Sequence, residues 1–541
     1  MIVTRLTLKF LITLTAIVFF SCAEKTTINT ESSLLNLDSL LTKNQVGATM
    51  LPDTIAPIEA PFDMPQLKKP VFKDFELSII QTGARQNQLS TKQIQEAIDK
   101  VHEQGGGRVL IPAGDWNSGR IILKSNVNLH LEAGANLYFS GEIKDFLPTV
   151  FTRHAGVEVM SLGACIYAYK QDNIAITGKG TLYGPAKGSI LDQQMTQNVI
   201  EKFVPLENPV EERIYDGANG SPILLPAFIS PTLCTNVYIE GVTLERTAFW
   251  NIVPIYCDKV IIRGITVNSV GIPKGDGIDI VSSKNVLIEY STLNSGDDCF
   301  TMKSGRGLDG LRVNKPTENV VIRYCLAQQG HGGVTIGSET AGMIRNIYMH
   351  DCVFDNTTVG IRFKTRRPRG GGGQNFFYER IRMNLKGTAF KWDMLGQELY
   401  VGALASRLPI REVNDLTPKF ENVVLNDILV EKAETFVKIY GIPESPLENV
   451  SFENIKVNQT NSFFTAADAH KLRFKNVSVQ SKDSLLFLEQ VSDVVFENVN
   501  FKLGGEELHV RVKGDEVKDI RFENTVPTKP VNWNSNHYKL P

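Results

Sequence analysis

The sequence predicts an all-β solenoid, a parallel β-helix with one helix capping its N-terminal end. A short strand-like unit, in which a polar residue precedes alternating apolar positions, recurs through the second half of the chain, and most copies lie 22 to 27 residues apart. This interval is too short for the crossover helices of an α/β fold and fits a chain that rises one strand spacing per circuit. A β-propeller is the alternative, but its blades need about 40 to 50 residues each.

The N-terminus carries an export signal. Two basic residues precede an apolar run over residues 10–20, which is too short to span a membrane, so residues 1–21 are expected to be a signal peptide. Cys22 follows in a context that resembles the lipobox of bacterial lipoproteins, although an ordinary cleavage site is the alternative. Residues 22–66 are rich in Ser, Thr, Asn and Pro and predict a flexible tether. We therefore expect an exported protein, located in the periplasm or held by a lipid anchor at the outer membrane or cell surface.

The β-helix is expected over residues 67–525, with a C-terminal tail over residues 526–541. Ser90 to Gln93 form a capping-box pattern, and the apolar spacing from Ile94 to Val101 predicts the one capping helix. Helical periodicity then almost disappears. The clearest copies of the strand unit start at Asn236, Lys259, Asn285, Asn319, Asn346, Asn422, Asn449, Lys471, Asp493 and Asp519.

Charge and cysteine content exclude several classes of function. The net charge of -2 gives no overall basic field for nucleic acid. The six cysteines after Cys22 show no CxxC pattern and no Cys/His cluster at zinc spacing, so no metal and no other cofactor is expected. Cys325 and Cys352 occupy the same place in similar segments, which favours a buried thiol ladder over a disulfide. A capped solenoid of this kind can be a monomer, which is the state we expect.

A second set of strands can be aligned by its apolar alternation. The inward pairs are Ile278/Ile280, Phe300/Met302, Val334/Ile336, Ile361/Phe363 and Phe390/Trp392. In this register Asp276 and Asp298 stack in neighbouring coils, about one strand spacing of roughly 4.8 Å apart. Asp297 and His331 share the position one place earlier.

Cations follow on the same face of the aligned strands. Arg362 falls in one outward column with Asp279, Thr301, Thr335 and Lys391, and Lys364 falls in the column of Lys303. The residues between the inward pairs are expected to face water. Three carboxylates, a histidine and several cations therefore converge on consecutive coils.

The column indicates chemistry because stacked carboxylates resist simultaneous ionisation and so cost stability. Taken alone, Gly296-Asp-Asp298 is most simply an Asx turn. Clustered carboxylates without a metal or a nucleophilic Ser or Cys are typical of glycoside hydrolysis, in which one carboxyl protonates the leaving oxygen and another attacks or activates water. Arg362 and Lys364 would then pair with an anionic group such as a uronic acid carboxylate. The basic run over residues 362–369 has a solvated surface loop as its alternative.

These residues resemble glycoside hydrolase family 28, the polygalacturonases, over about residues 60–525. The resemblance rests on four ordered motifs, Lys274-Gly-Asp-Gly-Ile-Asp279, Gly296-Asp-Asp298, Gly330-His-Gly332 and Arg362-Phe-Lys364. It implies a right-handed parallel β-helix of the pectin lyase-like type and inverting hydrolysis of α-1,4-galacturonosidic bonds in pectic polysaccharides.

The resemblance also implies a role for each matching residue. Asp297 would be the general acid, while Asp276 and Asp298 would position and deprotonate the water. His331 would orient or tune the acid. Arg362 and Lys364 would bind a galacturonate carboxylate on the leaving-group side. Inversion requires room for water, roughly 6.5 to 9.5 Å between the acid and base carboxyls.

The chain departs from the family pattern at several places. Lys274 stands where the family has Asn, so it either grips a further substrate carboxylate or pairs with Asp276. Leu225 and the segment after Trp250 also differ from many relatives. Residues 184–221 interrupt the repeat and could wall off one end of a cleft, which favours exo action by comparison with bacterial exo-acting members. Lys391, beside Arg362 in its column, is a further candidate for substrate binding.

Three alternative functions remain open at this point. A rhamnogalacturonan or other pectin-backbone hydrolase is one, although those enzymes generally lack the Gly-His-Gly and Arg-Ile-Lys elements. A calcium-dependent pectate lyase-like enzyme is the second, and the cations beside Asp297 would repel calcium. A non-catalytic polysaccharide-binding β-helix is the third, and the retention of all three aspartates argues against it.

Overall fold

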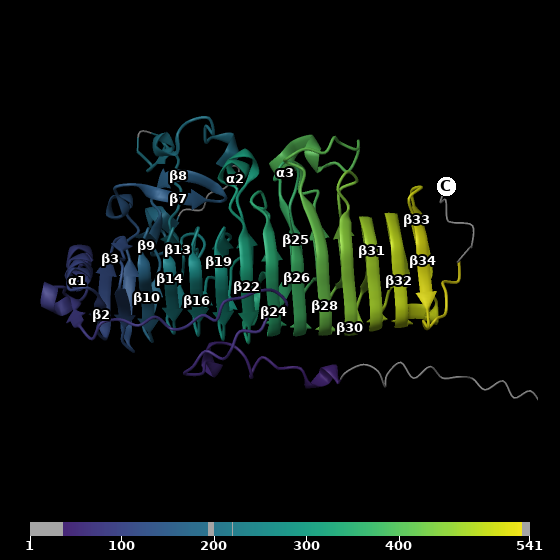
Figure 1. Ribbon diagram of the computed structural model, residues 1–541, viewed down its shortest axis with the longest axis horizontal. Coiled ribbons are helices and arrows are strands. Elements are labelled where there is room, and N and C mark those ends of the chain that lie inside the picture. Colours follow the sequence, from purple (N-terminus) through teal and green to yellow (C-terminus); the bar gives the residue numbers. More distant parts are fainter. Residues whose placement is uncertain (1–35, 193–199, 219, 533–541) are drawn as a thin grey trace, which may run out of the picture.

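The strands wind into one elongated parallel β-helix (Figure 1). The computed structural model describes residues 36–192, 200–218 and 220–532. The expected signal peptide and Cys22 lie outside the described residues. None of the described helices is long and apolar enough to cross a membrane.

Three rows of parallel strands form the walls, and the first row contains the recurring unit seen in the sequence. Its members are β1 (Glu76–Ser78), β2 (Gly107–Ile111), β5 (Val127–Leu131), β10 (Asp172–Gly178), β14 (Thr235–Glu240), β16 (Asp258–Arg263), β19 (Lys284–Glu289), β22 (Thr317–Arg323), β24 (Ile344–Asp355), β26 (Gly372–Asn384), β28 (Lys419–Lys432), β30 (Leu447–Thr460), β31 (Ser462–Ser481), β32 (Leu485–Leu503) and β34 (Lys518–Glu523).

The second row is shorter. It comprises β3 (Gly114–Ser118), β6 (Ala135–Phe139), β11 (Thr181–Tyr183), β15 (Thr243–Glu245), β17 (Thr266–Asn268), β20 (Thr292–Asn294) and the start of β23 (Leu326–Ile336).

The third row carries the polar column. It begins with β4 (Ile121–Ile122), β9 (Ala164–Tyr169) and β13 (Ala227–Thr232), and continues through β18 (Ile278–Val281), β21 (Phe300–Lys303), the end of β23, β25 (Thr357–Lys364), β27 (Thr388–Asp393), β29 (Thr435–Tyr440) and β33 (His509–Lys513).

The turn residues explain why so many units begin with asparagine. Asn285, Asn319 and Asn346 have φ of 55°, 57° and 57°, in the left-handed region that Asn tolerates better than most residues. Each side-chain amide also donates to the preceding coil: Asn285 to Asp258 at 2.7 Å, Asn319 to Asn285 at 3.2 Å and Asn346 to Asn319 at 3.0 Å. The sequence pattern therefore marks a ladder at one corner of the solenoid.

The interior is the expected apolar stack. The inward pairs predicted from Ile278/Ile280 to Phe390/Trp392 are all fully buried. Aromatic rings continue the stack between coils, with the Phe363 and Trp392 centroids 5.0 Å apart. Cys325 and Cys352 are buried free thiols, and the Cys325 N–H lies 3.4 Å from the Cys352 Sγ, as expected for a thiol ladder.

Helix α1 (Thr91–Glu103) covers the N-terminal end of the coil, as predicted, and buries Ile94, Ala97, Ile98 and Val101. The predicted capping box is wrong. The Ser90 hydroxyl donates to the carbonyls of Arg85 and Gln88 instead of accepting from the first turn of the helix, because the preceding loop folds back over it.

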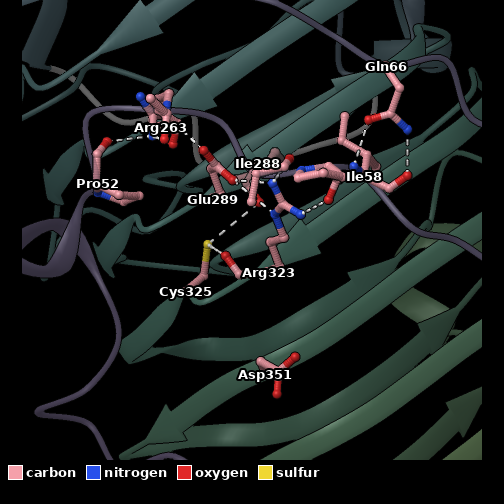
Figure 2. Close-up of polar contacts among 12 residues, drawn as sticks. Pro52, Ile58, Gln66, Arg263, Ile288, Glu289, Arg323, Cys325 and Asp351 are labelled. Carbon is pink, nitrogen blue, oxygen red and sulfur yellow. Dashed lines mark hydrogen bonds and ion pairs between the residues drawn. The ribbon is translucent and has the colours of Figure 1, made fainter.

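The prediction of a flexible tether is wrong for residues 37–66, which lie along the outside of the first row (Figures 1 and 2). Arg263 donates to the carbonyl of Pro52 at 2.8 Å, and Arg323 donates to those of Ala56 and Pro57, both at 2.8 Å. Glu289, buried between the two guanidiniums, pairs with both at 2.8 Å. Polar composition suggested a free chain, but the backbone carbonyls of this strap are bound by arginines far along the sequence.

Loops outside the third row form a second layer at the edge opposite the strap (Figure 1). A small sheet of β7 (Val150–His154), β8 (Val157–Ser161) and β12 (Ile214–Tyr215) includes the end of the interruption at residues 184–221. Helices α2 (Gly307–Val313) and α3 (Glu398–Val401) belong to the same layer. Within this layer Arg213, which directly precedes β12, forms a buried ion pair with Asp309 of α2 at 2.8 Å.

Candidate active site

The predicted strand register is confirmed, and it assembles the site. Ile278 pairs with Phe300, Phe300 with Val334, Val334 with Ile361, and Ile361 with Phe390. One pocket on this face is lined by six of the predicted residues: Lys274, Asp276, Asp297, His331, Arg362 and Lys364. Asp298 lies directly beneath it and is fully buried.

Asp298 is held by two cations. The Lys364 Nζ lies 2.8 Å from its Oδ2, and the Arg362 Nη1 lies 3.3 Å from its Oδ1. Burial opposes ionisation, but the charges of Lys364 and Arg362 outweigh it and hold the pKa of Asp298 well below its usual value. Asp298 is therefore the most readily ionised of the three aspartates.

Asp297 is the solvent-accessible carboxyl of the pair. Its side chain is 23% exposed, and its Oδ1 lies 3.3 Å from the His331 Nδ1. Burial and the charge of Asp298 raise the pKa of Asp297, but the hydrogen bond with His331 and the charge of Lys364 outweigh them, so the pKa lies below its usual value. The His331 Nδ1 also lies 3.2 Å from the Arg362 Nη1, so it either donates to Asp297 or accepts from Arg362, depending on its tautomer.

Asp276 has the opposite electrostatic environment. Burial and the neighbouring Asp279 raise its pKa well above the usual value, although the Lys303 Nζ lies 3.2 Å from its Oδ2. Its other oxygen is buried and has no hydrogen-bond partner among the described residues. Among the three aspartates of the column, Asp276 therefore holds a proton most readily in the free site.

Residues that were expected to face water are buried beneath the pocket. Asp279, Thr301 and Thr335 are fully buried, and the Thr301 hydroxyl donates to Asp279. The prediction fails because the outer layer covers this wall of the β-helix, and Lys303 folds back across it. The Lys303 Nζ lies 3.1 Å from Asp279 and 4.4 Å from the centre of the Trp250 ring.

The buried charges around Lys303 were given no role from the sequence. Lys303 lies 3.9 Å from Glu339, which in turn pairs with Arg306 at 2.7 Å. Lys303 could be placed by its column, since it aligns with Lys364. Glu339 and Arg306 lie beyond the ends of their strands, so the spacing of the repeat does not predict where their side chains lie.

The two remaining predicted cations differ in their placement. Lys274 is half-buried and lines the pocket, with no ion pair to Asp276 among the described contacts. Lys391 pairs with Arg362 in the strand register, as expected, but it does not line the pocket. Burial lowers the pKa of Lys391, and the neighbouring Arg362 and Lys438 add to this effect. A role for Lys391 in substrate binding stays a prediction.

Asp297, Asp298 and His331 each place one potential ligand atom within 4.8 Å of the others, which is compatible with a metal ion. However, the Asp298 oxygens already contact Lys364 and Arg362, and two positive charges so close oppose a further cation. The same distance matters for catalysis. One oxygen of Asp297 lies closer to one oxygen of Asp298 than the roughly 6.5 to 9.5 Å usual between the carboxyls of inverting glycosidases, and Asp276 in the preceding coil is a further carboxyl that can position water.

An accessible carboxyl, a buried carboxyl with a raised pKa and a buried carboxyl with a lowered pKa lie together on a parallel β-helix, an arrangement that suits a glycoside hydrolase. The comparisons agree that the protein is a glycoside hydrolase. The family model described as glycosyl hydrolases family 28 matches residues 218–481, which contain all four motifs. Over these residues the chain resembles that family, and it is polygalacturonase-like.

Individual relatives support the same assignment. The chain is 26% identical to a probable polygalacturonase of Vitis vinifera over 68% of this chain and 71% of that protein. It is 26% identical to an exo-poly-alpha-D-galacturonosidase of Dickeya chrysanthemi, over 57% of this chain and 55% of that one. The solved exopolygalacturonase of Thermotoga maritima superposes with a TM-score of 0.65 and 26% identity, covering 83% of this chain and 94% of that one. The expected right-handed parallel β-helix is thereby confirmed.

Proposed function

We propose that the protein hydrolyses α-1,4-galacturonosidic bonds of pectic polysaccharide and acts from a chain end. The observation that carries this proposal is the coupling of the carboxylates to Arg362 and Lys364, since both cations contact Asp298 from the floor of the pocket. These two cations carry one positive charge more than Asp298 neutralises, and a uronic acid carboxylate matches this excess, whereas a neutral glycan does not.

The proposed mechanism assigns one role to each group. Asp297 protonates the glycosidic oxygen, because it is the most accessible of the three aspartates. Asp298 is ionised and takes the proton from the water as the water oxygen bonds to the anomeric carbon, and Asp276 orients that water from the adjacent coil. His331 positions the Asp297 carboxyl through its ring nitrogen. Inversion at the anomeric carbon is part of the proposal, and the anomer first released, followed by NMR, tests it.

Asp297 needs a proton to act as the acid, yet its pKa lies below the usual value in the free site. Substrate binding can raise the pKa of Asp297. A bound carboxylate neutralises Lys364 and Arg362, and this removes part of the positive charge that favours ionised Asp297. The pKa of Asp297 then rises, so substrate binding itself prepares the acid.

Exo action is supported by the layer of loops beside the pocket. Residues of α2, α3 and the interruption at 184–221, among them Lys202 and Leu206, surround a hollow of about 580 Å³ that shares Arg369 and Tyr400 with the pocket. These loops stand where a long chain would continue on that side. The Dickeya and Thermotoga relatives are named as exo-acting enzymes.

Activity on polygalacturonate, compared between the wild type and Asp297→Asn, tests the proposal. We expect the variant to lose turnover while keeping its fold, and Arg362→Ala or Lys364→Ala to lower kcat/KM more than kcat. Asp99→Asn, on the capping helix and paired only at the surface with Lys124, serves as the control. Full activity in Asp297→Asn would overturn the acid assignment, and equal cleavage of neutral glycans would overturn the role of the cations.

We propose in addition that the chain is an exported, monomeric lipoprotein anchored through Cys22. The proposal is supported by the apolar run before Cys22 and by the strap, which lies along the first row of strands, whereas the pocket lies on the third row. Such an anchor would leave the pocket open to polysaccharide. Incorporation of labelled palmitate into the wild type, and its loss in Cys22→Ser, is the expected result; an unlabelled wild type would refute the anchor.

A further inference from the structure

The cations of the pocket are not equivalent. Arg362 and Lys364 both contact Asp298, and Lys303 contacts Asp276 and Asp279. These three side chains are therefore already paired with aspartates within the free site. A substrate carboxylate must compete with aspartates for them.

Arg366 lines the same pocket and has no ion pair with any described carboxylate. Its guanidinium carbon lies 4.7 Å from the centre of the Tyr400 ring, and its Nη2 donates to the Ser338 hydroxyl at 3.2 Å. Its Nε and Nη1 are buried and have no hydrogen-bond partner among the described residues. Burial lowers its pKa, and so does the neighbouring Arg306.

Buried donors without partners are costly and uncommon, so their presence in a pocket points to a ligand that satisfies them. The Arg366 guanidinium lies against the Tyr400 ring, and its Nε and Nη1 are two unpartnered donors on different edges of the group. A carboxylate oxygen matches such a donor with a charge-assisted hydrogen bond.

The neighbouring arginine, Arg367, has other partners. Arg367 pairs with Glu444 and donates to the carbonyls of Leu404 and Ser406, so it ties the α3 loop to the β-helix. This division shows that the basic run from residue 362 is neither a plain surface loop nor one uniform binding patch.

We propose that Arg366 is a specificity residue that binds a uronic acid carboxylate through a charge-assisted hydrogen bond, at the Tyr400 end of the pocket. The inference rests on the proposed function, since it assumes that the pocket takes a galacturonate chain. It adds a carboxylate receptor to Arg362 and Lys364, at the end of the pocket formed by Tyr400.

Calorimetric binding of trigalacturonate to the Asp297→Asn protein tests the inference, with and without Arg366→Gln. Loss of a charge-assisted hydrogen bond predicts a 10- to 100-fold weaker Kd in Arg366→Gln. Binding of the carboxyl-reduced, neutral trisaccharide should change less than twofold. In the active enzyme, the same substitution should raise KM more than it lowers kcat.

Arg411→Gln is the matched control, because Arg411 also has a buried Nε without a partner but does not line the pocket. Its Kd should stay within twofold of the parent. Arg366→Lys keeps the charge, loses the guanidinium donors and should give an intermediate Kd, which also decides the question if Arg366→Gln does not fold. If the wild type hydrolyses galacturonan but both Arg366 variants keep the parent Kd, this inference alone is refuted. If the wild type does not hydrolyse galacturonan, the proposed function is refuted.

Discussion

Replacement of Lys303 by methionine should destabilise the protein strongly, because Lys303 is the central cation of a buried acidic cluster. Its side chain is 4% exposed, and its Nζ lies 3.1 to 3.9 Å from carboxylates of Asp279, Asp276 and Glu339. Burial favours the neutral amine, but these carboxylates outweigh it and hold the pKa of Lys303 well above its usual value. Lys303→Met leaves them buried without their cation, and such a loss costs about 3 to 5 kcal/mol.

Urea unfolding, followed by tryptophan fluorescence, measures this cost, since Lys303 lies against the Trp250 ring. Lys284→Met is the matched control, because Lys284 is 51% exposed and pairs with Asp258 at 3.8 Å, a surface contact worth about 0 to 1 kcal/mol. Adding Asp279→Asn to Lys303→Met removes one uncompensated charge and should restore about 1 kcal/mol or more. The reasoning fails if Lys303→Met costs no more than Lys284→Met, or if Asp279→Asn restores nothing.

Three further predictions concern pH and the strap. Burial lowers the pKa of His154 to about 3, so the stability that its neutral form gives the fold is fully present above pH 6.5 and is lost as the pH falls towards 3. The free energy of unfolding of the wild type should therefore decline with falling pH, and His154→Phe should reduce this decline by up to about 1.4 kcal/mol per pH unit in urea titrations. An equal slope in both proteins would contradict this. Because substrate raises the pKa of Asp297, the high-pH fall of kcat should occur at higher pH than that of kcat/KM, and coincident profiles would exclude the proposed preparation of the acid. Deletion of residues 1–58 should cost at least about 3 kcal/mol, because Arg263 and Arg323 lose charge-assisted bonds to strap carbonyls, and an unchanged urea midpoint would show that the strap contributes nothing.

The sequence allowed the strand register of the site to be predicted because the apolar alternation repeats from coil to coil. Aligning Ile278, Phe300, Val334 and Ile361 was enough to bring Asp276 beside Asp298 and Arg362 beside Thr335. A parallel β-helix has this property because each coil contacts only its neighbours, so position within the repeat becomes position in space.

Features outside the period could not be found in this way. Glu339, Arg306 and Tyr400 reach the site from loops whose lengths do not repeat. The burial of Asp279 depends on the same loops, which cover a wall that alternation alone places in water.

The strap was missed for a different reason. Its bonds join backbone carbonyls of residues 52–57 to arginines more than 200 positions later, and a carbonyl leaves no signature in the sequence. Composition rich in Pro and polar residues was consistent with a free chain. Once Arg263, Glu289 and Arg323 are seen as one buried row, the extended backbone beside them acts as their partner.

Product analysis of polygalacturonate digested in the presence of EDTA tests the central claim most directly. Reducing ends and ultraviolet absorbance are followed together, and the products are separated at the earliest times. The account predicts a rise in reducing ends without absorbance, with monomeric galacturonate as the first product. Absorbance that appears only without EDTA would show calcium-dependent elimination and would contradict every catalytic role proposed for Asp276, Asp297 and Asp298.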